Sequence, residues 1–463
     1  MDRLHNKVLL PVDKIPKKWL NIKPFMKSKP YPLLLPNGKP ADFESVCQIF
    51  PEECVKQGVT EEPFVEIPKE IREIYALRFR PTPIQRAYRL EKEIGVEGED
   101  IKIFFKREDV TPAGSHKGNT AIAQAYYARE QGLKGLMTET GAGQWGSALS
   151  LAGALTGITV KVWMVRISFQ QKPARQTLMN AYGAEVMASP SNKTEAGKRF
   201  YEKDPNHPGS LGIAISEAIE ASMSSDEYRY SLGSVVDFVC LHQTVVGQEA
   251  KMQMEMIDEY PDVVIGCIGG GSNFSGLAFP FIKDKLTGDK PNLDIIGSEP
   301  YACPSLTKGE FTWDFGDTAH MAPIVKMYTL GSTFIPPPVH AGGLRYHGAA
   351  PLVSQLTHEG VMRSVAIHQL ESLQAGIKMA KSEGIMCAPE TSHAVAAAIN
   401  EALEAKQNGE KKTILFNYSG HGLLDLQAYK YLLEGVLENY EYPDADIKKA
   451  MSELPEIDES TFM

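Results

Sequence analysis

The sequence lacks long apolar runs. No stretch approaches the roughly 20 apolar residues that a membrane-spanning helix needs. The short apolar run near the N-terminus is broken by Pro11 and Asp13, which is unlike a signal peptide. We therefore expect a cytoplasmic protein with no membrane-bound part.

Positive charge is also scarce. The chain has 58 acidic and 48 basic residues, a formal net charge of −10 at pH 7. A nucleic-acid-binding surface needs clustered basic side chains to neutralise phosphates. The basic runs at 14–18 and 411–412 are too short to form one. The composition argues against a nucleic-acid partner.

The few cysteines are scattered. None forms a C-x-x-C pair or has histidines at zinc-ligand spacing, so neither a disulfide framework nor a metal site is indicated. We expect buried, reduced thiols at Cys47, Cys54, Cys240, Cys267, Cys303 and Cys387.

The first 80 residues differ from the rest of the chain. They are dense in proline and aromatic residues and show little periodicity. Proline stiffens the backbone and removes hydrogen-bond donors, so we predict an ordered arm wrapped on the body, with short helices at 41–57 and 68–76. Trp19, Phe25 and Leu33 to Leu35 offer too much apolar area to remain in water.

From about residue 100, short β-branched runs alternate with amphipathic stretches. Strands are expected at 101–105, 159–167, 184–188, 263–268, 293–297 and 413–417. Helices are expected at 118–131, 147–155, 172–182, 211–222, 244–260, 275–285, 368–382 and 392–406. This alternation is typical of α/β folds, so we predict two domains, each with a central parallel sheet flanked by helices. A chain of 463 residues is also too long for one core.

The predicted boundaries are an arm at 1–80, a larger α/β domain at 81–116 and 245–440, a smaller one at 117–244, and a tail at 441–463. In such folds a ligand binds at the carboxyl ends of the strands and between the domains.

The first of four glycine-rich turns is Gly114 to Asn119. It places Lys117 at a helix N-terminus, where the positive end of the helix dipole disfavours the ammonium form. A lysine with a lowered pKa suits Schiff-base formation with an aldehyde. From this turn alone, an ordinary surface lysine is the alternative.

The second turn, Glu139 to Gly146, opens another predicted helix. Its backbone N–H groups would form a nest for a carboxylate or phosphate. It has neither the Walker lysine nor G-x-G-x-x-G spacing, so ATP and dinucleotides fit poorly. Glu139 either takes part in the reaction at this site or caps the predicted helix.

The third turn, Gly269 to Asn273, follows a predicted strand. Three glycines, a serine and an asparagine make a phosphate cradle, and no lysine follows, so a fixed cofactor monophosphate is indicated. A tight turn without a ligand is the alternative. The fourth turn, Ser419 to Gly422, is weak evidence alone but lies at the same rim.

Together these motifs resemble a known family. In order they read PAGSHKGNTA, ETGAGQWGSA, IGGGSN, APETSHA and NYSGHG, and they are similar to the β chain of tryptophan synthase, a fold-type II enzyme that uses pyridoxal 5′-phosphate. The second, longer type of β chain also carries the proline-rich arm and HAGGLRYHG at 340–348. The resemblance runs from about residue 5 to 440.

The resemblance implies a role for each matching residue. Lys117 and Glu139 would be catalytic, Lys117 as the Schiff-base lysine that also moves the α-proton and Glu139 facing the indole nitrogen. The implied cofactor-binding residues are Lys117, His116, Asn119, Gln144, Ser234, Gly269, Gly270, Gly271, Ser272, Asn273, Glu390 and Ser419. The implied substrate-binding residues are Thr140, Gly141, Ala142, Gly143, Gln144, Trp145 and Arg345. The larger domain would bind the cofactor, and the smaller would carry mobile elements on the substrate side.

These roles imply a β-replacement in which indole and L-serine give L-tryptophan and water. The Ser419 hydroxyl does not keep the pyridine nitrogen protonated, so the ring is a moderate electron sink that favours loss of a β-leaving group. Glu139 would stabilise the positive charge that develops on indole. The same acid could protonate the departing hydroxyl.

The chain departs from the better-known type of β chain at two places, with Trp145 for histidine and His421 for arginine. Arg345 lies in the segment that forms a mobile lid in this family. It could bind a carboxylate or phosphate, which leaves O-phospho-L-serine open as the donor, or it could pair with an acid across the domains.

Two other functions compete with this β-replacement. A serine or threonine deaminase would use the same cofactor but would not need Glu139 to orient indole. A non-catalytic partner of an α subunit would not need Lys117. The resemblance implies a homodimer and leaves a monovalent cation open. An α subunit is expected to bind weakly or transiently, because the arm would cover its docking surface.

Overall fold

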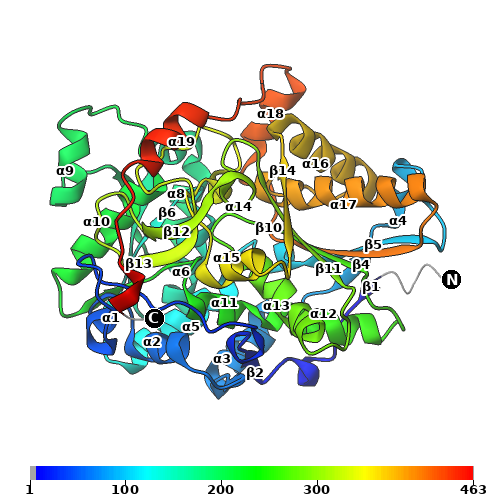
Figure 1. Ribbon diagram of the computed structural model, residues 1–463, viewed down its shortest axis with the longest axis horizontal. Helices are drawn as coiled ribbons and strands as arrows, with labels where there is room; N and C mark the ends of the chain where they lie inside the picture. The colour runs from blue at the N-terminus through cyan, green and yellow to red at the C-terminus, as the bar shows by residue number, and fades with distance from the viewer. Residues whose placement is uncertain (1–6, 462–463) are drawn as a thin grey trace.

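Two sheets organise the computed structural model, which describes residues 7–461 (Figure 1). Residues 1–6 of the predicted arm and 462–463 of the predicted tail lie outside the described residues. The larger sheet has the order β1 (Lys7–Val8), β4 (Ile84–Arg86), β5 (Ile101–Arg107), β15 (Lys412–Tyr418), β10 (Val263–Cys267), β11 (Asp294–Pro300) and β14 (Arg363–Ile367). β1 and β4 pair antiparallel, and the other strands are parallel.

The smaller sheet is fully parallel. Its order is β8 (Glu185–Ser189), β7 (Thr159–Val165), β6 (Gly135–Thr140) and β9 (Tyr228–Tyr230). The α/β fold class with parallel sheets and flanking helices is confirmed. Apart from β1, the two sheets take their strands from the two predicted domain ranges, and the domain boundaries themselves stay a prediction.

Helices pack around both sheets. Those in the smaller-domain range are α5 (Gly118–Glu130), α6 (Gln144–Thr156), α7 (Arg166–Gln171), α8 (Pro173–Ala181), α9 (Glu195–Tyr201), α10 (Leu211–Met223) and α11 (Asp237–Gln243). Those that follow in the chain are α12 (Val245–Glu255), α13 (Ser272–Leu286), α14 (Ser305–Lys308), α15 (Pro351–His358), α16 (Gln369–Glu383), α17 (Pro389–Asn408), α18 (Leu426–Leu433) and α19 (Asp444–Met451). α4 (Tyr88–Glu93) precedes β5, and an antiparallel pair, β12 (Glu310–Phe315) with β13 (Ile324–Thr329), lies apart from the main sheets.

Of the parallel strands in the two sheets, the prediction missed β6, β9 and β14, and it also missed the antiparallel strands β1, β4, β12 and β13. β6 reads GLMTET, so its glycine and polar residues hide a strand that is buried along its whole length. β9 has only three residues and is recognised by its pairing with β6. β6 matters most, because Glu139 lies near its carboxyl end.

The bounds of several predicted helices differ from the structure: α13 begins at Ser272 and α17 at Pro389, each three residues before its predicted start, and α12 ends at Glu255, five residues before its predicted end. α6 begins at Gln144 and not at Ser147, because Gly143 adopts φ 95° and caps the helix earlier. The helix expected at 41–57 is two helices, α1 (Phe43–Ile49) and α2 (Glu52–Val59), separated at Pro51, which has no N–H to continue the first.

The described part of the arm is packed against the body. β2 (Lys18–Leu20) pairs with β3 (Phe64–Glu66), and α3 (Lys69–Ile74) leads toward β4. Trp19 and Leu34 are both 0% exposed, and the Trp19 ring lies 4.5 Å from that of His242. The apolar side chains explain this order, because leaving them in water would cost about 2 kcal/mol each.

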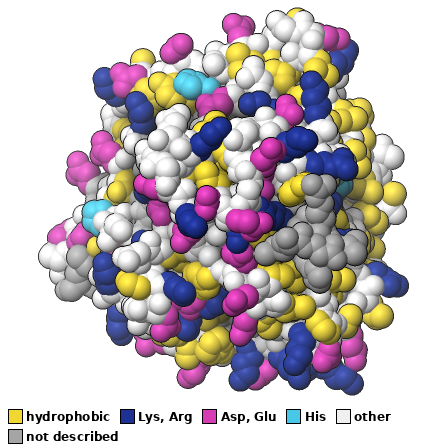
Figure 2. Space-filling view, turned by 90° about the vertical axis from the view of Figure 1, so that its right-hand side faces the viewer, with side chains coloured by type: hydrophobic (Ala, Val, Ile, Leu, Met, Phe, Trp, Pro, Cys, Tyr) yellow, Lys and Arg dark blue, Asp and Glu magenta, His cyan; other side chains and the backbone are white. Residues whose placement is uncertain are grey.

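The surface carries both signs of charge. On the face shown in Figure 2, lysines and arginines are interspersed with acidic side chains. Within residues 7–461, no helix is long and apolar enough to cross a membrane. The cysteines are free thiols, all buried except the half-buried Cys47.

Candidate active site

The loops after β5, β6, β10 and β15 meet around a cavity that is partly open to solvent. These are the carboxyl ends of the parallel strands, where α/β folds bind ligands. The cavity brings together most of the predicted site residues: His116, Lys117, Glu139, Thr140, Gly141, Ala142, Gln144, Trp145, Ser234, Gly269, Gly270, Gly271, Ser272, Asn273, Glu390 and Ser419.

Three predicted residues do not line this cavity. The Asn119 amide is turned away from it and bonds Glu108, Arg80 and Gln243. Gly143 caps α6 behind the nest and packs on the side chain of Arg175.

Arg345 is the third. It lines a separate, smaller cavity, where its Nη2 donates to the Pro336 carbonyl at 2.8 Å. Among the described residues no acidic side chain forms an ion pair with it, so the cross-domain pairing considered for Arg345 is not seen.

Lys117 is not an exposed surface lysine. It caps the N-terminus of α5 and lines the cavity, where its Nζ donates to the Gly233 carbonyl at 2.8 Å and lies 3.4 Å from Ser272 Oγ. Burial lowers the pKa of Lys117 to about 8, against the opposing charges of Glu139 and Glu390. A substantial fraction of its amine is therefore neutral near physiological pH.

Glu139 lies near the end of β6 and is 3% exposed. Burial raises the pKa of its carboxyl group to about 7, and a hydrogen bond from the Tyr230 phenol to Oε2 opposes that rise. The helix-capping role considered for Glu139 falls instead to Thr140, whose Oγ1 accepts from the Gly146 N–H at 3.1 Å. Tyr230 was not foreseen, because it approaches Glu139 only through the pairing of β9 with β6.

The third glycine turn forms a cradle at the start of α13. Gly271 has φ 111° and caps the helix, whose first N–H groups have no partner within it. A Cβ on Gly270 would lie 2.7 Å from Ser234 Oγ, so this glycine allows Ser234 to reach the turn. His116 connects the cradle to the last turn, with ring nitrogens 3.2 Å from Ser272 Oγ and from the Ser419 carbonyl.

Burial lowers the pKa of His116 to about 3, so the ring is neutral. The end of the cavity near Ser419 is uncharged as well. There, Ser419 Oγ lies 2.6 Å from Thr391 Oγ1 and 3.6 Å from Cys267 Sγ. Glu390 is set to one side, accepting from the Gly343 N–H at 2.8 Å and from Gln144 Nε2 at 3.0 Å. An amine, an anion cradle and a neutral hydroxyl around one cavity fit a pyridoxal phosphate.

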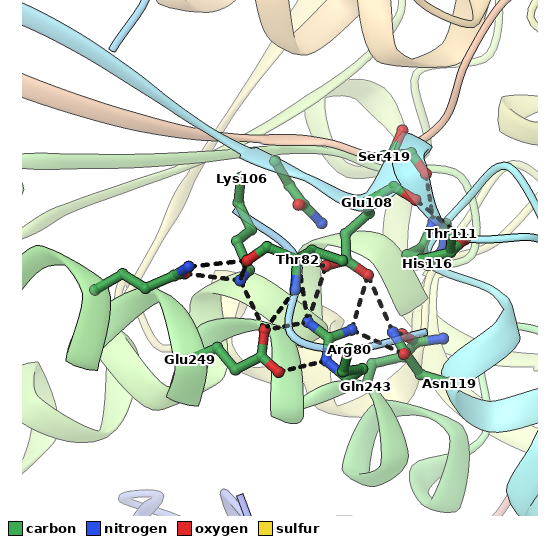
Figure 3. A network of polar contacts seen from close by, with 12 residues as sticks. Arg80, Thr82, Lys106, Glu108, Thr111, His116, Asn119, Gln243, Glu249 and Ser419 are labelled. Atoms are coloured by element: carbon green, nitrogen blue, oxygen red, sulfur yellow. Dashed lines mark hydrogen bonds and ion pairs between the residues drawn. The ribbon is translucent and has the colours of Figure 1, made fainter. Parts of the chain in front are cut away.

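A buried charge network lies directly behind the site (Figure 3). The Arg80 guanidinium donates to Glu108 at 3.0 Å and to Glu249 at 2.7 Å, and Lys106 donates to Glu249 at 2.8 Å. All four side chains are 0% exposed. Through Asn119, the network fixes the first turn of α5, the helix that Lys117 caps.

The comparison with known proteins agrees with this arrangement. Residues 75–420 match the family model described as "Pyridoxal-phosphate dependent enzyme". The chain is 55% identical over 443 residues to tryptophan synthase beta chain 2 of Pyrococcus abyssi, covering 96% of this chain and 100% of that protein. It is 54% identical to tryptophan synthase beta chain 2 of Aquifex aeolicus, covering 93% and 99%. The chain belongs to the tryptophan synthase β chain family.

Solved structures show the wider fold to which this family belongs. Maize serine racemase superposes with a TM-score of 0.54 at 18% identity, covering 80% of this chain and 98% of that one. The processed threonine deaminase isoform 2 of Solanum lycopersicum gives 0.57 at 20% identity, covering 88% and 98%. At such identities the likeness shows the fold alone, so it does not favour the deaminase alternative over membership of the β chain family.

Proposed function

We propose that this β chain condenses indole with L-serine to give L-tryptophan and water, using pyridoxal 5′-phosphate. The observation that carries the proposal is that Lys117, the Gly269–Asn273 cradle and Glu139 face one cavity. A deaminase would need the first two but would have no use for a buried carboxyl group placed to meet an indole nitrogen.

The residues that would hold the cofactor divide along the cavity. Lys117 would bind its aldehyde, Ser419 would meet its pyridine nitrogen, and Glu390 would lie beside its ring. Its phosphate would be bound by His116, Ser234 and the cradle Gly269, Gly270, Gly271, Ser272 and Asn273. When bound, the cofactor withdraws electrons from the α-carbon of the amino acid.

The substrate carboxylate would be bound by the turn Thr140 to Gln144. This turn precedes α6, whose N-terminal N–H groups and dipole favour an anion. The Lys117 amine, with a pKa of about 8, would accept the α-proton. Lys117 and the turn together orient the amino acid.

Glu139 would serve both halves of the reaction. With a pKa of about 7, it can donate a proton to the departing serine hydroxyl when protonated. As a carboxylate, it can accept a hydrogen bond from the indole N–H while C3 forms the new bond. Its burial strengthens this interaction by excluding water.

The decisive experiment is spectral. Purified protein with pyridoxal 5′-phosphate is expected to absorb in the visible range, and K117A to lose that band. L-serine should change the spectrum, and indole should restore it while tryptophan forms. Pyruvate and ammonia released equally with and without indole would favour the deaminase instead. A far higher kcat/KM with O-phospho-L-serine than with L-serine would change the donor.

We also propose a homodimer in the cytoplasm that binds an α subunit only weakly or transiently. The resemblance to the longer β chains supports it, since the arm covers part of the body. Gel filtration with and without the cognate α chain tests both statements. A monovalent cation stays a prediction, tested by kcat in potassium chloride against tetramethylammonium chloride.

A further inference from the structure

Trp145 is the second residue of α6 and stands at the cavity wall with 4% exposure. Its ring face contacts the segment 231–234 directly, and its ring edge reaches the same segment through Thr138. This segment has no regular secondary structure, so its position depends on these contacts and on the Ser231 N–H, which donates to the Met137 carbonyl at 2.8 Å.

The ring edge fixes the start of the segment. Trp145 Nε1 donates to Thr138 Oγ1 at 2.7 Å, and the Thr138 hydroxyl in turn donates to the Ser231 carbonyl. From the opposite side Gln124 of α5 accepts from Ser231 Oγ at 2.7 Å and donates to the Leu232 carbonyl at 2.9 Å. The segment is therefore bound between α6 and α5.

The ring face rests on Gly233. A Cβ on this glycine would lie 2.2 Å from Trp145 Cδ2, so the indole occupies the space that a side chain would need. The carbonyl of the same glycine accepts from Lys117 Nζ at 2.8 Å, and Nζ lies 6.0 Å from the centroid of the Trp145 ring. The ring thus contacts the backbone that binds the amine and covers one side of the amine.

We propose that Trp145 is a positioning residue for Lys117: it fixes the Gly233 carbonyl as the acceptor for the free Lys117 amine and keeps water from that amine. This role rests on the proposed function, in which the same amine binds the cofactor aldehyde and later carries a proton. It gives a purpose to the tryptophan that replaces histidine at the cavity wall.

The charged groups around Lys117 come from other elements. Glu139 on β6 and Glu390 on α17 favour its ammonium form, whereas the neighbouring His116 and the Cys267 thiol on β10, whose pKa is raised by burial, are neutral. Burial is the largest influence on the pKa of Lys117 and acts in the opposite direction. Replacing Trp145 would reduce the burial and leave the acidic groups in place.

The test is the rate at which pyridoxal 5′-phosphate attaches to the cofactor-free protein, followed by visible absorption across pH. Only the neutral amine attacks an aldehyde, so the midpoint of the profile reports the pKa of Lys117. In W145A the midpoint should rise by about one unit or more, which slows attachment about tenfold at pH 7. W145F keeps a ring but loses the N–H, and its midpoint should lie between those of W145A and the wild type.

Two further variants distinguish the effect of the hydrogen bond at the ring edge from a general disturbance of the structure. T138V removes both the acceptor of the Trp145 N–H and the donor to the Ser231 carbonyl, so its midpoint should move at least as far as that of W145F, and W145F/T138V should be no worse than T138V. W313F is the matched control: Trp313 on β12 is 3% exposed and its Nε1 also donates a hydrogen bond, to Glu459 at 2.6 Å, but it does not line the cavity. Its midpoint should equal that of the wild type.

If W145F and T138V both have the wild-type midpoint, the role of Trp145 is overturned, whether or not W145A folds. Circular dichroism identifies variants that do not fold, and borohydride reduction with peptide mass analysis verifies attachment at Lys117. Failure of the cofactor to attach to wild-type protein would overturn the proposed function itself. The two failures are therefore distinguishable.

Discussion

At the scale of single residues, environment sets the chemistry of this site more than residue type. Lys117 and Glu139 are ordinary ionisable residues, yet burial brings their pKa values to about 8 and about 7. Both groups can then exchange protons near neutral pH, where a general acid or base is most effective. The hydrogen bond from the Tyr230 phenol is a contact on Glu139 that a single substitution can remove.

Removing that contact should shift the pH profile. In Y230F the lost hydrogen bond no longer stabilises the Glu139 carboxylate, so the pKa of Glu139 rises above about 7. Because the carboxylate is the form proposed to accept a hydrogen bond from the indole N–H, kcat should fall on the acid side. We expect the acid limb of kcat against pH to move upward by about one unit, with the larger loss at pH 6 and little loss at pH 9.

The matched control is Y228F. Tyr228 lies on the same strand. Its phenol oxygen accepts a hydrogen bond from Thr159 Oγ1 at 3.2 Å, whereas the phenol of Tyr230 bonds Glu139. Its acid limb should stay where it is in the wild type. An unshifted limb in Y230F would refute the assignment of that limb to Glu139.

At the scale of elements, one ion-pair cluster joins the two sheet-bearing parts of the chain. Asp425 follows the last glycine turn and accepts from Lys172 Nζ and from Arg175 Nη2, each at 2.7 Å. The Arg175 stem packs on Gly143, the cap of α6, so the cluster connects the turn proposed to bind the substrate carboxylate to the larger-domain range. Its burial, with Asp425 1% exposed, makes the geometry rigid.

D425N should therefore loosen the substrate turn. The amide has nearly the same shape but leaves the buried Arg175 and the partly buried Lys172 without a counter-charge. We expect the KM for L-serine to rise about tenfold with a smaller change in kcat, because the lost order affects binding more than the chemical step. Steady-state kinetics with saturating indole measures both constants.

E434Q serves as the comparison. The side chains of Glu434 and Lys430 form an exposed ion pair near the end of α18, and exposed pairs contribute little to stability. Its KM should match that of the wild type. A KM within about twofold of the wild type in D425N would mean that the cluster does not affect the turn.

At the scale of the whole molecule, the charge network behind the site (Figure 3) joins distant parts of the sequence. Arg80 comes from the loop before β4, Lys106 from β5 and Glu249 from α12. Burying two cations together with two carboxylates costs little free energy of folding only while all four groups are present. It therefore couples the stability of the fold to the position of α5.

E249A should destabilise the protein strongly. It leaves Lys106 without its carboxylate partner and Arg80 with only Glu108, and breaking a buried pair of this kind costs about 3–5 kcal/mol. Urea denaturation followed by circular dichroism should show a clearly lower midpoint. E73A, which removes an exposed i,i+4 partner of Lys69, should change stability by less than about 0.5 kcal/mol. Equal midpoints for the two variants would contradict this account.

The linear sequence predicted much of the fold and of the candidate site. β-branched runs located strands such as β7 and β10, because such residues fit a buried parallel sheet wherever they occur. Glycine-rich turns located the cradle and the nest, since their function depends on adjacent backbone N–H groups. Lys117, Glu139 and most of their neighbours were found from these local patterns and from the resemblance they carry.

Only the tertiary structure decided which side chains meet. β6 was hidden by its polar residues, and Tyr230 reaches Glu139 across 91 positions of sequence through the pairing of β9 with β6. Asn119 and Arg345, included on motif position alone, are turned away from the cavity by the Arg80 network and by the Pro336 carbonyl. Adjacency along the chain determines backbone conformation, whereas burial, pKa and long-range hydrogen bonds depend on contacts that form only when the sheets assemble.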